Sequence, residues 1–191
     1  MCLEKMKFRE DTKGSTFIPM RALMSIVIAG VIGALAYAGF QQMEKIRAEK
    51  EMERICNELI ASLSTMVASG NARDIHNPAD GEGDSRTIDF SLPTKLVYLG
   101  FGVDPDPDND GEMESKMLAD GACIVYKIDG LSKKIFWLDN IKFRKGIKNE
   151  KGIWVIDDQQ GMVILREGKI KLTFELVKDF SGKYVLIKPA Y

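Results

Sequence analysis

The chain has 191 residues, of which 45% are hydrophobic and 29% charged. This composition is typical of a folded protein with room for one ordinary domain and a short additional segment. Its 27 basic and 28 acidic residues nearly cancel, which argues against recruitment to nucleic acid by bulk charge, so we expect no nucleic-acid partner. The three cysteines, Cys2, Cys56 and Cys123, are too few for a disulfide-built miniprotein and lack the paired spacing of a zinc site.

Residues 22–40 form an apolar segment of 19 residues without a charge. As a helix it would span roughly 28 Å, about the thickness of a hydrocarbon core. Every face of this helix is apolar or small, whereas a buried helix of a soluble protein usually keeps a polar stripe. We therefore predict a transmembrane helix. The alternative is a secretory signal peptide, for which Ala36-Tyr37-Ala38 is a weak match to a cleavage site.

The orientation of the predicted span follows from the segments on either side of it. Residues 1–21 form a short basic segment that is too small to fold, whereas the residues after the span contain all the strand patterns. We expect a single-pass protein of the cell membrane, with the N-terminus in the cytoplasm and the C-terminal domain outside. Gly30, Ala34 and Ala38 recur every fourth residue, a spacing that allows membrane helices to self-associate or to pack on related subunits.

Residues 41–70 are predicted to continue the same helix as an amphipathic stalk. Its apolar residues recur at spacings of three, four and seven: Met43, Ile46, Met52, Ile55, Leu59, Leu63, Met66 and Val67. Lys45 and Glu49 are spaced as a helical ion pair, and Gly70 is a suitable C-cap. An apolar stripe on a solvated helix needs a cover, so we predict that the stalk packs on a β domain, giving an α+β fold with an antiparallel sheet.

A short motif precedes the apolar segment. Lys13-Gly14-Ser15 follows a basic leader, and the apolar helix begins a few residues later. This arrangement resembles the type IV pilin-like proteins of archaea, whose leader ends in a Lys/Arg-Gly bond cut by a prepilin-type peptidase. The resemblance implies a class III signal peptide cleaved after Gly14. It also implies an apolar helix that waits in the membrane and later packs into a filament core or a pseudopilus.

Residues 71–86 are rich in Asn, Asp, Gly and Pro and are predicted to be a linker loop that contains His76, the only histidine. Residues 87–191 are predicted to be an extracytoplasmic β domain, because apolar residues alternate with polar ones along several segments. The alternating sets are Ile88, Phe90 and Leu92, then Ile124, Tyr126 and Ile128, and later Ile170, Leu172, Phe174 and Leu176. Asp129-Gly130, Glu167-Gly168 and Ser181-Gly182 are turn pairs that predict hairpins between neighbouring strands.

Residues 104–114 form an acidic loop with a carboxylate at every second position. These residues are Asp104, Asp106, Asp108, Asp110, Glu112 and Glu114. Two prolines and the repulsion of like charges disfavour a strand here. Counted from Asp106, acidic residues take the first, third, fifth and ninth places and Gly111 the sixth, as in a calcium loop. Met117 stands at the twelfth place of an EF-hand, so the loop looks more like short Asp-rich calcium repeats. The two alternatives are a structural calcium site and a solvated acidic loop.

Two pairs of residues leave alternatives open. Cys56 on the stalk and Cys123 on a strand can form a disulfide if their Cα atoms lie within ~7 Å, and otherwise they are two buried free thiols. Trp137 and Trp154 lie in apolar runs, where large aromatic side chains usually belong to a core, although a ligand-stacking role is the alternative.

Three functions fit the sequence. The first is a pilin-like or pseudopilin-like structural subunit that acts through helix packing and surface display. The second is a membrane-tethered binding or sensor domain that never enters a filament. An exported enzyme is the least supported, because no catalytic pair stands at a recognisable spacing, and we expect no catalytic residues.

Overall fold

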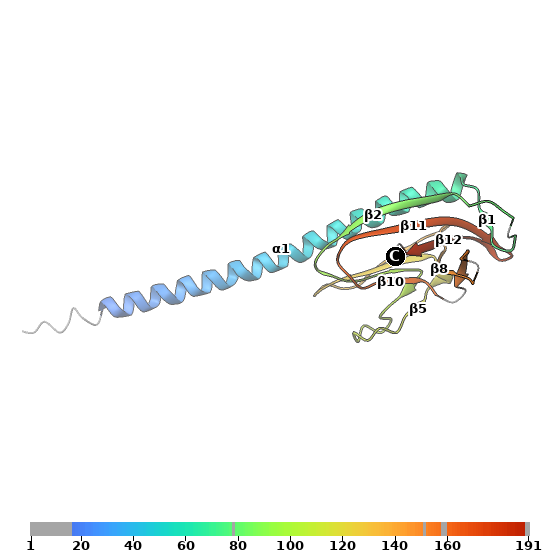
Figure 1. The fold of residues 1–191 in the computed structure, drawn as a ribbon. Helices are drawn as coiled ribbons and strands as arrows, with labels where there is room; N and C mark the ends of the chain where they lie inside the picture. Colours follow the sequence, from blue (N-terminus) through green and yellow to red (C-terminus); the bar gives the residue numbers. More distant parts are fainter. Residues whose placement is uncertain (1–16, 78, 151, 158–159, 190–191) are drawn as a thin grey trace, which may run out of the picture. The chain divides into compact units, whose positions relative to one another are not determined.

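The computed structural model describes residues 17–77, 79–150, 152–157 and 160–189 (Figure 1). They form one long N-terminal helix and a β domain made mostly of antiparallel strands, which confirms the predicted α+β class. The chain divides into two compact units between Glu44 and Lys45. The division falls within the helix, a few residues beyond the predicted end of the span at residue 40, and each unit is described by itself.

The helix α1 (Phe17–Ser69) has 53 residues and joins the predicted span and stalk without interruption. Its last turn is closed by the amide of Gly70, which donates a hydrogen bond to the carbonyl oxygen of Met66 (2.8 Å). A Cβ at Gly70 would lie 2.3 Å from that oxygen. Glycine is required at this helix end because of the close approach.

The larger sheet has the strand order β1-β11-β12-β8-β9, and β2 pairs with β11 beside β1. The strands are β1 (Arg73–Asp74), β2 (Ser85–Leu92), β8 (Phe143–Lys148), β9 (Trp154–Asp157), β11 (Gly168–Asp179) and β12 (Gly182–Pro189). The predicted turn at Ser181-Gly182 is confirmed, since it joins β11 to β12 in an antiparallel hairpin. The sheet is not wholly antiparallel, because β1 runs parallel to β11 and β12 runs parallel to β8.

The smaller sheet has the order β10-β3-β6-β7 and is antiparallel throughout. Its strands are β3 (Leu96–Phe101), β6 (Cys123–Ile128), β7 (Lys134–Trp137) and β10 (Met162–Ile164). Asp129-Gly130 joins β6 to β7, as predicted. A short pair, β4 (Val103–Asp104) and β5 (Lys116–Met117), and a 3₁₀ turn (Ala119–Gly121) complete the elements of the described chain.

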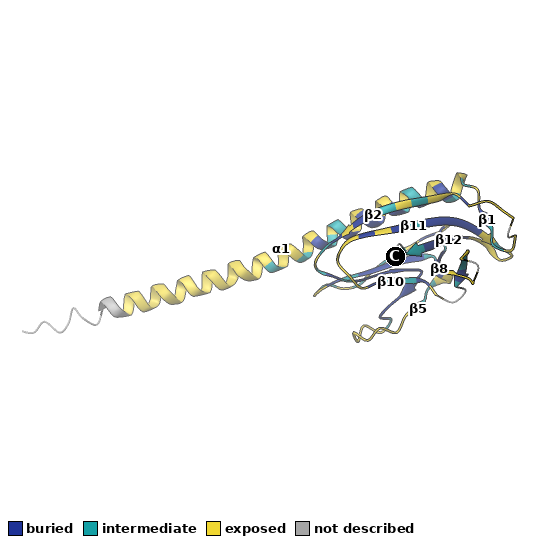
Figure 2. Cartoon of the chain, in the orientation of Figure 1, coloured by how far each residue is buried: buried dark blue, intermediate teal, exposed yellow. Residues whose placement is uncertain are grey.

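The main core lies between the two sheets and the second half of α1. Phe101 of β3 contacts Phe143 of β8 and Phe174 of β11 through ring edges, so aromatic side chains join the sheets. The helix supplies seven buried side chains to this core: Ala48, Met52, Ile55, Cys56, Leu59, Leu63 and Met66. Figure 2 shows this change along α1, from an exposed first part to a part with buried positions. The predicted packing of the stalk on the β domain is confirmed for residues 48–66.

The helix contacts an outer strand of each sheet. Arg86 of β2 donates a hydrogen bond to the Ser62 hydroxyl (2.9 Å), and Lys134 of β7 forms an ion pair with Glu49 (3.1 Å). Glu49, predicted to pair with Lys45 along the helix, thus binds a strand. These contacts place α1 against both β2 and β7, and its buried side chains join the main core.

Three predicted features differ from the structure. The segment 71–86 is not wholly a loop, because it contains β1 and the start of β2. The hairpin predicted at Glu167-Gly168 is wrong, since β10 pairs with β3 and residues 165–167 lead from one sheet to the other. Turn residues mark where a chain reverses but carry no information about which strands pair. Met43 and Ile46 are exposed, so the buried stripe of the stalk starts later than predicted.

Candidate functional site

The first part of α1 exposes an apolar surface. Every residue from 20 to 40 is exposed, including Leu35 (69%) and Phe40 (68%), and Arg21 carries the only charge in this stretch. The helix is long and apolar enough to cross a membrane, and its most apolar stretch is not buried by any other part of the described chain. Near residue 40 the Gln41 amide donates a hydrogen bond to the Tyr37 hydroxyl (3.1 Å). A tyrosine at this place is typical of a membrane interface.

The predicted processing residues Lys13, Gly14 and Ser15 lie outside the described residues. His76, predicted to lie in a loop, is exposed and stacks on Phe180, with 4.2 Å between the ring centroids.

Cys56 and Cys123 are buried free thiols, the second of the two alternatives. Cys56 belongs to the main core together with Tyr126, whereas Cys123 packs with Tyr98 and Val125 in a separate cluster. Because side chains alternate along β6, Cys123 and Tyr126 point to opposite faces of the smaller sheet. Burial raises the pKa of Cys56 to about 12 and that of Cys123 to about 11, so both thiols stay protonated.

The inner end of the acidic loop is neutralised by lysines of the β6–β7 hairpin. Asp104 and Asp106 are buried, with exposed fractions of 3% and 1%. Lys133 lies 2.6 Å from Oδ2 of Asp104 and also donates to the carbonyl oxygens of Asp106 and Pro107. Lys127 lies 3.0 Å from Oδ2 of Asp106 and is the main cause of the lowered pKa of that carboxyl. Asp104 is therefore the partner of the Lys133 ammonium group. Neither lysine was predicted from the sequence.

The outer end of the loop gathers three carboxylates. Oxygens of Asp106, Asp108 and Asp110 lie within 4.8 Å of one another, close enough to surround one ion. Glu112 and Glu114 are exposed and lie outside this group. The turn is formed by Asn109 and Gly111, both with positive φ. The structure thus gathers three of the six predicted ligands, and calcium binding stays a prediction.

A buried ion-pair network lies on the outer face of the larger sheet and was not foreseen. The Glu175 side chain is 1% exposed and accepts from Nε and Nη2 of Arg73 (2.8 and 3.0 Å) and from Nζ of Lys188 (2.9 Å). The amide of Gly83 donates to its Oε1 (3.2 Å). Burial alone would raise the pKa of Glu175, but the hydrogen bonds from Arg73 and Lys188 lower it. Glu175 is therefore ionised and fully hydrogen-bonded.

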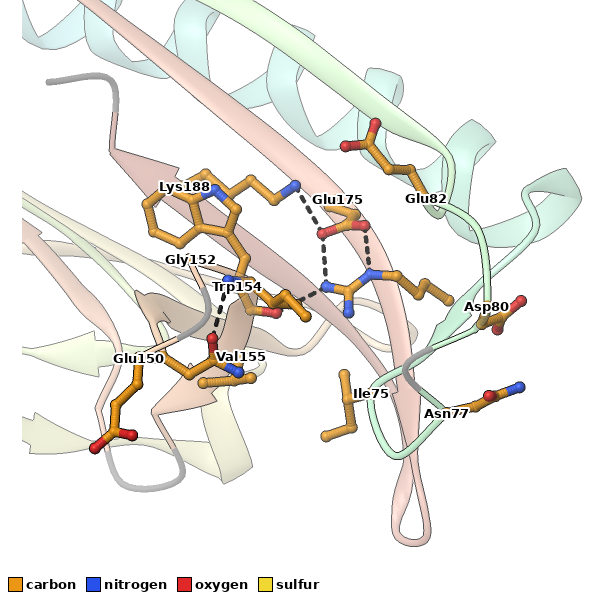
Figure 3. Close-up of a pocket in the computed structure, with 13 residues that line it drawn as sticks. Ile75, Asn77, Asp80, Glu82, Glu150, Gly152, Trp154, Val155, Glu175 and Lys188 are labelled. Atoms are coloured by element: carbon orange, nitrogen blue, oxygen red, sulfur yellow. Dashed lines mark hydrogen bonds and ion pairs between the residues drawn. The ribbon is translucent and has the colours of Figure 1, made fainter.

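This network forms the floor of a cavity of about 580 Å³. One side is lined by Ile75, Asn77, Asp80 and Glu82. The other is lined by Asn149, Glu150, Gly152 and Ile153, together with Trp154 and Val155, which project from β9 (Figure 3). The Trp154 carbonyl accepts a hydrogen bond from Arg73 (3.0 Å), and Lys148 lies over its indole ring, 5.2 Å from the centroid. Trp154 is thus half-buried at the wall of a cavity, whereas Trp137 is 61% exposed on β7 and is not a core residue.

Comparison of the chain with protein-family models, with curated proteins and with solved structures finds no match. The class of protein is therefore defined by the fold and by the exposed helix alone. The chain is an α+β protein in which a helix long and apolar enough to cross a membrane leads into a β domain.

Proposed function

We propose that the chain is a membrane-anchored, pilin-like structural subunit that holds its β domain outside the cytoplasm. The observation that carries this proposal is the continuous exposed apolar surface of residues 20–40. Exposure of such a surface to water is unfavourable by about 25 cal/mol per Å² of apolar area, and contiguous apolar surfaces of this kind mark membrane or protein contacts. Lipid covers the helix before assembly, and helices of other subunits cover it afterwards.

The small residues of the span support packing between helices. A Cβ added at Gly30 or Gly33 would meet no atom within 4 Å, so contacts among the described residues do not require glycine at these positions. Small residues let the backbones of membrane helices approach closely. The glycines are therefore suited to contact with a second apolar helix, either from another copy of the chain or from a related subunit.

The continuity of α1 supports a display role. Residues 45–69 of the helix belong to the same compact unit as the strands, and Met52 and Leu63 are fully buried in its core. The segment that follows the span is thus part of the β domain itself. A subunit of this kind needs no catalytic chemistry, only a helix that packs and a domain that faces outward.

The proposal is tested by co-expression of the full chain with a prepilin-type peptidase, followed by mass spectrometry of the membrane-extracted protein. We expect a mature N-terminus at Ser15 and an uncut leader in the Gly14→Val variant. An intact leader in the parent chain would overturn the pilin assignment.

Membrane anchoring is tested separately by alkaline extraction. We expect the parent chain in the membrane pellet. The Val31→Arg variant should be released in part, because an arginine at the centre of a membrane helix makes insertion less favourable by about 3 kcal/mol. Full release of the parent chain would overturn anchoring.

A membrane-tethered binding domain is the second candidate, and the cavity above Glu175 favours it. The two functions are compatible, since a displayed subunit can also carry a ligand site.

A further inference from the structure

The hydrogen bonds of Glu175 leave an excess of positive charge at the floor of the cavity. Its two oxygens accept three hydrogen bonds from Arg73 and Gly83 and form an ion pair with Lys188, so Glu175 has no capacity left for a ligand. Arg73 and Lys188 carry two positive charges against the single negative charge of Glu175. A buried charge is favourable only when it is paired, so the floor has one positive charge that no floor carboxylate balances.

Both cations keep donors that the network does not use. Among the described residues, Nη1 of Arg73 has no hydrogen-bond partner, while Nε and Nη2 are engaged by Glu175 and Trp154. Within the part of the chain that the structure describes, Glu175 is the partner of Lys188 Nζ, which leaves two of its three N–H donors unused. The Arg73 and Lys188 side chains are 10% and 14% exposed, and both residues line the cavity. Two largely buried cations with unused donors are suited to receive a carboxylate, which arginine binds with well-defined geometry.

The rim of the cavity has the opposite charge. Asp80, Glu82 and Glu150 line it and are all exposed. Figure 3 shows Asp80 and Glu82 along one side and Glu150 on the other. The Asp80 carboxylate already accepts a hydrogen bond from the amide of Asp74 (2.8 Å), whereas Glu82 is free of any such bond to the described residues. An anion without a positive charge of its own would be repelled at this rim, and a ligand with an ammonium group would be attracted.

The walls between floor and rim are apolar. Ile75, Ile153, Trp154 and Val155 line the cavity. The volume of about 580 Å³ lies within the range of about 300–1,000 Å³ that is usual for small-molecule sites. A ligand that matches the positive floor, the apolar walls and the negative rim has a carboxylate, an apolar body and an ammonium group.

We propose that this cavity binds a zwitterionic amino acid or short peptide. The ligand carboxylate is received by Arg73 Nη1 and Lys188 Nζ, its apolar side chain lies against Trp154, and its ammonium group faces Glu82. Glu175 acts as a positioning residue, because it holds both cations without touching the ligand. Ligand binding at this site does not depend on filament assembly or on cleavage of the leader. A failure of this proposal is therefore distinguishable from a failure of the proposed function.

Isothermal titration calorimetry of the full chain in detergent micelles tests the site, with L-leucine and the dipeptide Leu-Leu as probes. We expect saturable binding of at least one of them, with a Kd below about 1 mM. For the probe that binds, the N-acetylated form and the C-terminal amide should each bind at least tenfold more weakly, since each lacks one charge. No binding of either probe, or equal binding of a blocked form, would overturn the proposal.

Variants assign the two charged ends of the ligand. Lys188→Met should weaken binding of the probe at least tenfold, whereas Lys183→Met, an exposed lysine on the same strand outside this cavity, should leave it unchanged. Glu82→Gln should weaken binding of the free probe but not of its N-acetylated form. Circular dichroism monitors folding of each variant. If Lys188→Met does not fold, the blocked ligands and Glu82→Gln decide the outcome, and unchanged affinity in Glu82→Gln would overturn the assigned orientation.

Discussion

The ammonium group of Lys133 binds the Asp104 carboxylate and is surrounded by loop oxygens, as a bound metal cation would be. Its Nζ lies 2.6 Å from Oδ2 of Asp104 and within 3.0 Å of the carbonyl oxygens of Asp106 and Pro107. One carboxylate and two carbonyl oxygens thus surround a charge that is covalently part of the chain. This contact within the chain closes the inner end of the acidic loop.

Removal of this lysine should destabilise the domain. In Lys133→Met the buried carboxylate of Asp104 loses its partner, and breaking a buried ion pair from one side costs about 3 kcal/mol or more. Chemical denaturation should show this decrease in the free energy of unfolding. The neighbouring Lys134→Met removes an ion pair to Glu49 whose lysine side chain is 48% exposed, and it should cost less than about 1 kcal/mol. Equal effects of the two substitutions would contradict the assigned role of Lys133.

We predict that calcium acts through the outer end of the acidic loop. We expect the melting temperature to rise on addition of calcium, because an ion that binds only the native state stabilises it. The double variant Asp108→Ala with Asp110→Ala should abolish the rise, since both residues belong to the group of three carboxylates. The double variant Glu112→Ala with Glu114→Ala should keep it. If calcium leaves the melting temperature of the parent chain unchanged, the predicted calcium site is excluded.

The Glu175 network should make stability depend on pH. Its pKa is lowered in the folded state, because hydrogen bonds from Arg73 and Lys188 outweigh burial. The stabilisation is therefore complete above the ordinary carboxyl pKa of about 4.3 and is lost as the pH falls through the lower folded pKa. The free energy of unfolding, measured from pH 7 to pH 3, should decrease toward acid. Glu175→Gln should be less stable at pH 7 and show a weaker decrease, and an unchanged decrease would exclude this residue as a source.

The 3₁₀ turn before β6 offers a stabilising substitution. Ala119 has φ = 45°, a left-handed conformation that costs a residue with a Cβ about 1–2 kcal/mol. Glycine removes this cost but adds about 0.5–1 kcal/mol of unfolded-chain entropy, so Ala119→Gly should raise the free energy of unfolding by about 0.5–1 kcal/mol. Ala122→Gly, at φ = −87°, should lower it. Thermal denaturation that shows Ala119→Gly to be the less stable of the two would refute this explanation.

Periodicity predicted the elements of the fold well, and the reason is visible in single strands. Phe174 and Leu176 alternate with polar residues on β11, and both are fully buried as that pattern requires. Strand pairing was harder, because β10 and β11 follow one another in sequence yet belong to different sheets. No local signal distinguishes a hairpin from a connection between sheets when the turn residues are the same.

The candidate sites were less accessible to sequence reasoning. Glu175 stands among the polar residues that alternate with apolar ones along β11, so the pattern predicts a solvent-facing side chain. In the structure Arg73 of β1 and Lys188 of β12 pair with it, and it is buried. From the sequence, Lys133 is likewise expected to be an ordinary exposed lysine in a turn. Both roles depend on residues far away in sequence, Arg73 in the first case and Asp104 in the second, which no spacing rule brings together. The acidic loop was recognisable because its carboxylates are close in sequence as well as in space.

The burial of Met52 and Leu63 beneath strands from the far end of the chain has a consequence for biosynthesis. These helical residues leave the ribosome early, but the strands that complete their core, β11 and β12, are the last of the described elements to be made. Contacts between such distant segments form slowly, and incomplete chains with uncovered apolar stripes tend to aggregate. The apolar stripe of the nascent helix therefore stays uncovered until the final hairpin is available to complete the core.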